Sequence, residues 1–148
     1  MKSIELFAGA GGLGMGAELA GFSNVLAVEW DKWAVETLQY NRKLQFPLVN
    51  DWDIQKSDVR AIDFANYADK VELVTGGPPC QPFSMAGKHK AFDDKRDMFG
   101  AFADVLAAVA PKAFVAENVK GLTRAAFSNY LEYIKLRLRF PLLKLTVG

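Results

Sequence analysis

The sequence predicts an α/β domain in which a mostly parallel sheet carries helices on both faces. Short apolar runs alternate along the chain with longer amphipathic segments, the order expected of repeated strand–helix units. The glycine-rich segment GAGGLG, residues 9–14, stands between the first apolar run and the first amphipathic segment, where it can turn the chain sharply from a strand into a helix. The 148 residues, 51% of them hydrophobic, suffice for one core, so we expect a single domain over residues 1–148.

The pattern of apolar residues places each element. The apolar runs predict four strands and a weaker fifth, at residues 3–7, 25–29, 71–75, 113–117 and, more weakly, 47–50. The amphipathic segments predict helices between the strands, at residues 13–20, 32–41, 98–110 and 125–138. Asp31 precedes the second helix, and its side chain is suited to cap the first turn.

The last two helices have the clearest pattern, because apolar residues recur in them at helical spacing and should face the core. These residues are Met98, Phe99, Phe102, Val105, Leu106 and Val109 in one helix, and Phe127, Tyr130, Leu131, Ile134 and Leu138 in the other. Basic residues recur toward the end of the chain, and we interpret them as the exposed face of the last helix: Lys135, Arg137, Arg139 and Lys144.

The composition narrows the classes of function. Lys and Arg number 18 against 17 Asp and Glu, so the chain as a whole lacks the basic excess of a free-standing nucleic-acid binder. One cysteine and one histidine exclude a disulfide framework and are too few for a structural zinc site, so no metal is expected. The start resembles no secretory signal and no apolar run is long enough to span a membrane, which predicts a protein of the reducing cytosol.

The glycine-rich segment predicts a site for an adenosine-containing cofactor. Its G-x-G-x-x-G spacing, after a strand and before a helix, lets the backbone approach a ligand closely. Glu29 ends the second expected strand, where a carboxylate can bind two ribose hydroxyls, and Asp58 is suited to bind an adenine amino group. On these residues alone, a dinucleotide and S-adenosylmethionine are about equally favoured. A glycine turn that only packs helix on strand is the third interpretation.

The segment GGPPCQPFS, residues 76–84, is the most informative part of the chain. It follows the expected strand at residues 71–75, at the edge where open α/β sheets bind ligands. Prolines on both sides of Cys80 fix φ and hold its sulfur at a defined position, which favours a nucleophile over a buried filler residue. A thiol with a pKa of ~8.5 is only about a few per cent thiolate at neutral pH, but it is intrinsically very nucleophilic.

The next strand carries a carboxylate to the same edge. Glu117 ends this expected strand and is followed by Asn118 and Val119. Taken alone, Glu117 is also compatible with an ordinary acid at the end of a strand. Together with Cys80, it predicts a catalytic pair.

In order, spacing and strand context, these motifs resemble those of the cytosine carbon-5 DNA methyltransferases over about residues 3–122. The matching motifs are FAGAGG at residues 7–12, Glu29, DV at 58–59, GPPCQPFS at 77–84 and ENV at 117–119. The resemblance implies a Rossmann-like methyltransferase fold and DNA (cytosine-5-)-methyltransferase activity on double-stranded DNA, as in restriction–modification systems. The implied cofactor is S-adenosylmethionine, with S-adenosylhomocysteine as its product.

The resemblance also implies a mechanism. Cys80 would add to carbon 6 of a cytosine flipped out of the duplex, which makes carbon 5 nucleophilic. Glu117 would bind the ring nitrogen and the exocyclic amine and supply a proton. Carbon 5 would then take the methyl group and lose its proton to a base, and the cysteine would leave.

Two sets of binding residues follow from the same resemblance. The implied cofactor residues are Phe7, Ala8, Gly9, Gly11, Gly12, Leu13, Glu29, Trp30, Asp58, Val59, Gly77 and Pro79. Within this set, Trp30 would cover the adenine and Asp58 would read its amino group. The implied target-binding residues are Pro79, Ser84, Lys88, Arg96, Asn118 and Val119. Arg96 stands in an Asp-x-Arg motif with Asp94, where Asp97 replaces a glycine that is frequent in the family.

The family's sequences continue with an arginine-containing motif, a DNA-reading domain and a closing motif of the cofactor pocket, which this chain does not contain. Arg137 and Arg139 imitate the spacing of the arginine motif, but they fall in an expected helix and are not assigned its role. We therefore expect an incomplete enzyme whose partner is a complementary C-terminal fragment or subunit. The alternatives are a transfer-RNA methyltransferase of the same family, a cofactor-binding fragment without activity, and a nicotinamide-dependent oxidoreductase, which leaves the proline–cysteine segment unexplained.

Overall fold

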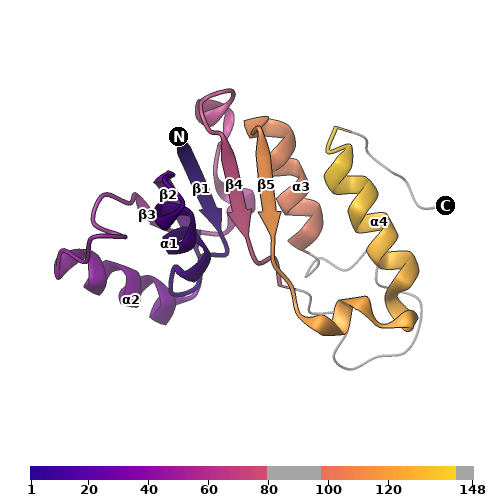
Figure 1. Cartoon of the computed structure of the whole chain (residues 1–148), viewed down its shortest axis with the longest axis horizontal. Coiled ribbons are helices and arrows are strands. Elements are labelled where there is room, and N and C mark those ends of the chain that lie inside the picture. The colour runs from indigo at the N-terminus through magenta and orange to yellow at the C-terminus, as the bar shows by residue number, and fades with distance from the viewer. Residues whose placement is uncertain (80–97, 143–148) are drawn as a thin grey trace.

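The computed structural model describes residues 1–79 and 98–142, and its centre is a five-stranded sheet (Figure 1). The strands are β1 (Lys2–Leu6), β2 (Ser23–Glu29), β3 (Ile54–Lys56), β4 (Leu73–Gly76) and β5 (Ala113–Ala116). They lie in the order β3-β2-β1-β4-β5, and every neighbouring pair is parallel. The predicted α/β class with a mostly parallel sheet is confirmed.

Within residues 1–79 and 98–142, four α-helices accompany the sheet, and short 3-10 turns join the elements. The helices are α1 (Gly12–Leu19), α2 (Lys32–Lys43), α3 (Met98–Val109) and α4 (Ser128–Arg139). The 3-10 turns are η1 (Val59–Ala61), η2 (Ala65–Tyr67), η4 (Lys120–Thr123) and η5 (Ala125–Phe127). The last expected helix therefore starts later than predicted, since residues 125–127 form a 3-10 turn before α4 begins.

Alternation along β1 divides the core between the two faces of the sheet. Ile4 and Leu6 are fully buried and share a cluster with Phe102 of α3. Glu5, between them in β1, lies on the opposite face, where it accepts a hydrogen bond from Gly14 of α1. A second buried cluster joins α2 to β2 and β3. Helices thus cover both faces, as predicted.

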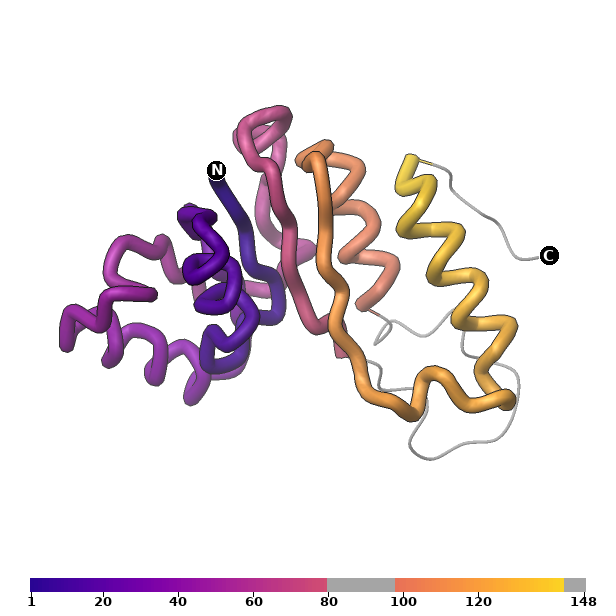
Figure 2. Tube along the Cα trace, viewed as in Figure 1, coloured from indigo at the N-terminus to yellow at the C-terminus, as the bar shows by residue number. Residues whose placement is uncertain are grey.

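Helix α4 packs against α3 rather than forming a separate unit. Figure 2 shows it running alongside α3 on the side away from α1 and α2. Phe99 of α3 is buried with Tyr130 and Ile134 of α4. Arg137 of α4 is only 8% exposed, and its Nη2 lies 3.2 Å from Oδ1 of Asp104. The interpretation of Arg137 as part of an exposed basic face was wrong, because this side chain faces α3 and its carboxylate.

The weak strand candidate at residues 47–50 is wrong. Helix α2 continues to Lys43, Gln45 adopts a left-handed conformation with φ of 57°, and residues 47–51 form turns. Val49 is nevertheless fully buried, which explains the apolar character of this segment. The third strand is β3, which pairs with β2 from Ile54 opposite Ala27. It has three residues, too few to show an apolar pattern in the sequence.

The carboxyl ends of all five strands meet at one edge of the sheet, because the strands are parallel. The segments that carry the predicted site residues all leave the sheet at this edge: the glycine-rich turn after β1, Trp30 after β2, Asp58 after β3, the proline segment after β4, and Glu117 after β5. Among the described residues, no helix has both the length and the apolar character to cross a membrane.

Candidate active site

The glycine-rich turn joins β1 to α1 with a left-handed backbone. Gly9 and Gly11 have φ values of 54° and 87°, which glycine adopts without steric strain. The Gly11 amide donates a hydrogen bond to the carbonyl of Ala8 at 2.8 Å. A Cβ on Gly11 would also lie 2.7 Å from Cδ2 of Leu38, so this position requires the absence of a side chain. A Cβ on Gly12 would meet nothing within 4 Å, so the backbone there is open to a ligand.

Glu29 ends β2 with its carboxylate against this turn. Its Oε2 accepts a hydrogen bond from the amide of Gly9 at 2.7 Å. Its Oε1 accepts from the amides of Trp30 and Asp31 at 2.7 and 2.8 Å. Three backbone donors fix the carboxylate, and because a carboxylate offers about four acceptor sites, it can still receive a ligand hydroxyl. Asp31 in turn caps α2 through two amides of the first helical turn, at 3.0 and 2.9 Å, which confirms the predicted cap.

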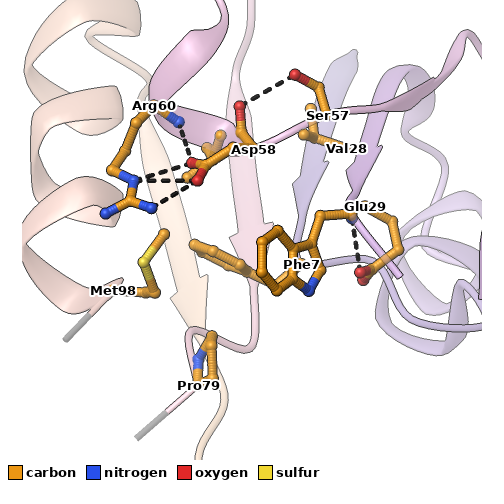
Figure 3. Close-up of a pocket in the computed structure, with 10 residues that line it drawn as sticks. Phe7, Val28, Glu29, Ser57, Asp58, Arg60, Pro79 and Met98 are labelled. Carbon is orange, nitrogen blue, oxygen red and sulfur yellow. Dashed lines mark hydrogen bonds and ion pairs between the residues drawn. The ribbon is translucent and has the colours of Figure 1, made fainter. Parts of the chain in front are cut away.

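A cavity of about 290 Å³ opens beside Glu29 at the carboxyl edge of the sheet (Figure 3). Its walls come from the ends of β1 to β4 and the start of α3: Phe7, Val28, Glu29, Trp30, Ser57, Asp58, Val59, Arg60, Pro79 and Met98. Apolar walls with a few fixed polar groups are typical of small-molecule sites. Phe7 holds a left-handed φ of 54°, a strained conformation for a side-chain-bearing residue. Trp30 is 72% exposed, so its indole is accessible to a ligand.

Asp58 lines the cavity, but Arg60 occupies part of its carboxylate. Nη2 of Arg60 lies 2.6 Å from Oδ2 of Asp58, and the Arg60 amide donates to Oδ1 at 2.9 Å. The side-chain hydrogen bond from Arg60, followed by the backbone one, lowers the pKa of Asp58, which therefore stays ionised. The side chain of Asp58 is 28% exposed, so the carboxylate can also accept from a bound group.

The proline segment leaves β4 beside Glu117. A Cβ on Gly77 would lie 3.3 Å from Oε2 of Glu117, so the carboxylate lies against the backbone of this segment. Nδ2 of Asn118 donates a hydrogen bond to the carbonyl of Pro78 at 2.8 Å. These contacts tie the segment that leads into Cys80 to the segment that carries the candidate acid.

The structure therefore assembles part of the predicted site. The predicted cofactor residues that line the cavity are Phe7, Glu29, Trp30, Asp58, Val59 and Pro79. Six predicted cofactor residues do not line the cavity and lie instead in the glycine-rich turn, in α1 and in the proline segment: Ala8, Gly9, Gly11, Gly12, Leu13 and Gly77. Val119 is 68% exposed beyond β5. The predicted residues outside the described part of the chain are Cys80, Ser84, Lys88, Asp94 and Arg96, and their roles stay predictions.

Four cavity residues escaped the sequence analysis: Val28, Ser57, Arg60 and Met98. Ser57 and Arg60 flank Asp58 in the sequence, so extending that motif by two residues would have found both. For Val28 and Met98, the apolar patterns of the sequence predicted burial and gave no indication of a ligand. Met98 packs against the core, as expected, and also borders the cavity at the start of α3.

Comparison with known proteins gives consistent matches along the chain. The family model for "C-5 cytosine-specific DNA methylase" matches residues 1–140. The type II methyltransferase M.PspPI of Psychrobacter sp. (strain TA137) is 48% identical over 120 residues, covering 80% of this chain and 27% of the relative. The type II methyltransferase M.NgoMIV of Neisseria gonorrhoeae is 42% identical over 132 residues, which cover 89% of this chain and 40% of the relative.

A solved structure agrees in fold. It is described as a DNA modification methyltransferase encoded within a prophage (E. coli), and it superposes with a TM-score of 0.71 at 29% identity. The match covers 94% of this chain and 38% of that chain. The 148 residues thus span less than half the length of these relatives.

Proposed function

Because this chain belongs to the C-5 cytosine-specific DNA methylase family, we propose that it provides the cofactor-binding and catalytic part of an enzyme that methylates carbon 5 of cytosine in double-stranded DNA. The observation that carries the proposal is the cavity at the carboxyl edge, whose lining includes both Glu29 and Pro79, the residue before Cys80. A cofactor held by Glu29 would lie next to the segment that bears the nucleophile.

The described residues fit S-adenosylmethionine, which supplies the methyl group. The Glu29 carboxylate retains acceptor capacity for ribose hydroxyls, and the aromatic rings of Phe7 and Trp30 suit an adenine. Asp58 is held ionised by Arg60 and is suited to accept from the adenine amino group. Gly11, the N-cap residue of α1, has no side chain to cap the helix, and the amide of Gly12 at the start of α1 suits the cofactor's carboxylate.

The proposed chemistry is divided between two residues. The thiolate of Cys80 bonds to carbon 6 of the flipped cytosine, and the electron pair of the opened double bond attacks the methyl group from carbon 5. Glu117, which lies against Gly77, binds the edge of the base and supplies the proton. A base then takes the proton from carbon 5, the double bond re-forms as the thiolate leaves carbon 6, and the ring nitrogen returns its proton to Glu117. The products are 5-methylcytosine and S-adenosylhomocysteine.

The proposed target contacts come from the proline segment, from the residues that follow it and from the segment after β5. Pro79, Ser84, Lys88, Arg96, Asn118 and Val119 are the proposed contacts to the target nucleotide and its phosphate. A complementary C-terminal fragment or subunit would add the remaining contacts, because the chain spans only 27% and 40% of two type II relatives. The family description, which names DNA, favours DNA over transfer RNA as the target. We further propose a role in restriction–modification in the bacterial cytosol.

Calorimetric titration tests the cofactor assignment directly. The chain should bind S-adenosylhomocysteine saturably, and NAD should give no binding heat at the same concentrations. Binding of NAD without binding of S-adenosylhomocysteine would replace the methyltransferase assignment with that of a nicotinamide-dependent enzyme.

A further inference from the structure

A buried carboxyl group lies beneath the first turn of α1. Glu5 is in β1, the central strand, and is only 2% exposed. Its Oε1 accepts a hydrogen bond from the amide of Gly14 at 2.8 Å. Its Oε2 has no hydrogen-bond partner within the described part of the chain. Glu5 does not line the cavity, and none of the roles proposed above uses it.

Helix α1 lacks the means to fix its own first turn. Gly11 occupies the N-cap position and offers no side-chain hydrogen bond to the free amides. The eight-residue helix GLGMGAEL also contains three glycines, which lower its intrinsic stability. The carboxyl of Glu5 therefore acts as a cap supplied by a neighbouring strand, and it ties the end of the glycine-rich turn to the rigid centre of the sheet.

The space around this carboxyl group is closely fitted. A Cβ on Gly14 would collide with Oε2 of Glu5 and would lie 2.7 Å from Cη2 of Trp52. Trp52 is 1% exposed, and its Nε1 donates to Oε1 of Glu18 at 3.0 Å. Glu5 and Trp52 thus form a fixed base under the turn, and Gly14 lets the helix sit directly on it.

Stability alone does not explain an acid at this position. Burial raises the pKa of Glu5, the Gly14 hydrogen bond lowers it, and the Glu29 carboxylate raises it, so that the pKa is about 7. An amide of the same shape would accept the Gly14 hydrogen bond without the penalty for burying a charge. The property of Glu5 that the first turn of α1 uses is therefore its acceptor oxygen, which lies 2.8 Å from the amide of Gly14, and not its charge.

We propose that Glu5 is a positioning residue of the cofactor site, which holds the glycine-rich turn and the first turn of α1 in their binding geometry by accepting the amide of Gly14. The inference rests on the proposed function, since it takes the turn to be the cofactor's contact. Glu5 acts through the backbone and touches neither the cofactor nor the base.

Two variants of Glu5 and one control test this role in the 148-residue chain. Glu5→Leu removes the acceptor and should weaken S-adenosylhomocysteine binding by about ten-fold or more, the scale of a lost hydrogen bond to a charged group. Glu5→Gln keeps the acceptor and should bind within about three-fold of the wild type. Ser3→Ala is the matched control, because Ser3 is a buried, unpartnered polar residue of the same strand. It should leave the affinity unchanged.

Thermal unfolding at pH 8 separates positioning from a purely structural role. We expect Glu5→Gln to unfold no lower than the wild type, and Glu5→Leu to lose affinity while it remains folded. A folded Glu5→Leu variant with wild-type affinity would overturn the inference. A loss of affinity in Glu5→Gln equal to that in Glu5→Leu would also overturn it.

A measurement on the wild-type chain covers the case in which Glu5→Leu does not fold. Amide exchange followed by NMR should be slow at Gly14 and slower again with S-adenosylhomocysteine bound. If the chain binds the cofactor but the exchange rate at Gly14 is the same with and without it, the role of Glu5 is overturned and the proposed function is not. A wild-type chain that binds no S-adenosylhomocysteine would overturn the proposed function, and this inference with it.

Discussion

The glycine-rich turn and the end of β5 lie at the same edge of one sheet, yet they differ in how completely this chain surrounds them. Around the turn, Glu29 receives three backbone hydrogen bonds, and Glu5 and Trp52 are buried beneath. Around β5, Phe114 and Val115 are 39% and 45% exposed, although strand β5 pairs with β4. The turn is thus the more enclosed of the two regions, whereas β5 exposes apolar side chains within the described part of the chain.

Changing the nucleophile should have the largest effect, confined to the target region. In an enzyme completed by a C-terminal fragment, Cys80→Ala should lower methyl transfer by about a thousand-fold or more, because no other group can form the bond to carbon 6. Affinity for S-adenosylhomocysteine should not change. Mass spectrometry should also show a covalent adduct between the wild-type enzyme and DNA carrying 5-fluorocytosine, since fluorine blocks the final elimination.

Two outcomes would break this assignment. Full activity in Cys80→Ala would mean that another group attacks the base. An active wild-type enzyme that forms no adduct with the fluorinated DNA would mean that no covalent bond to the base is made.

The buried acid of the cofactor region predicts a specific dependence of stability on pH. The pKa of Glu5 is about 7 in the folded chain and 4.5 as its ordinary value. Between these values, the unfolded chain releases a proton that the folded chain still holds, so the free energy of unfolding falls as pH rises from about 4.5 to about 7. The total contribution is on the order of 3 kcal/mol.

Denaturant titrations across this pH window measure the effect. The Glu5→Gln variant should lack this part of the pH dependence and should be more stable than the wild type above pH 7. Parallel pH profiles of the two proteins would show that Glu5 keeps an ordinary pKa in the folded state.

Glu29 should be the side chain whose loss most weakens cofactor binding. Glu29→Ala removes the ribose acceptor and the partner of the Gly9 amide, so we expect a loss of about 1.5–3 kcal/mol in S-adenosylmethionine affinity. Calorimetry gives the affinity, with Glu36→Ala as the control, because Glu36 is an exposed acid of α2 paired with Lys32 at 3.7 Å. Equal affinities of Glu29→Ala and Glu36→Ala for S-adenosylmethionine would mean that another acid binds the ribose.

The smallest effects come from two glycines with opposite requirements. Gly11→Ala should destabilise the fold by about 1–3 kcal/mol, because Gly11 has a φ of 87° and a Cβ there would meet Leu38. Gly16→Ala should stabilise it by about 0.5–1 kcal/mol, since Gly16 lies within α1 and its Cβ would meet nothing within 4 Å. Thermal unfolding measures both effects. Unfolding temperatures that change in the same direction in the two variants would contradict the described turn.

The sequence predicted those strands and helices whose apolar pattern extends over several consecutive turns or residues of the chain. Strands β1, β2 and β4 and helices α2 and α3 lie close to their expected places, because each buries apolar residues at the spacing of its own element. Strand β3 was missed because Ile54 is its one buried residue and its pairing with β2 is a long-range property. Long-range packing also hid Glu5, whose burial depends on the neighbouring strands and on α1.

The site shows the same limit. The motifs identified residues with distinctive chemistry, such as Glu29, Asp58 and Glu117. Their grouping at one edge was predictable because the carboxyl ends of parallel strands meet there. The contact of Arg60 with Asp58 depends on side-chain conformation, which the motif does not encode.

We expect the 148-residue chain to bind the cofactor without transferring its methyl group to DNA, and an assay of methyl transfer by the purified chain decides between these outcomes. Flipping a cytosine costs about a few kcal/mol, which contacts to phosphates must offset, and a chain of net charge +1 offers little of the basic surface required. With labelled S-adenosylmethionine and duplex DNA, we predict no labelled DNA from the chain alone and labelling once a complementary C-terminal fragment is added. Labelled DNA from the chain alone, abolished by Cys80→Ser, would contradict the account.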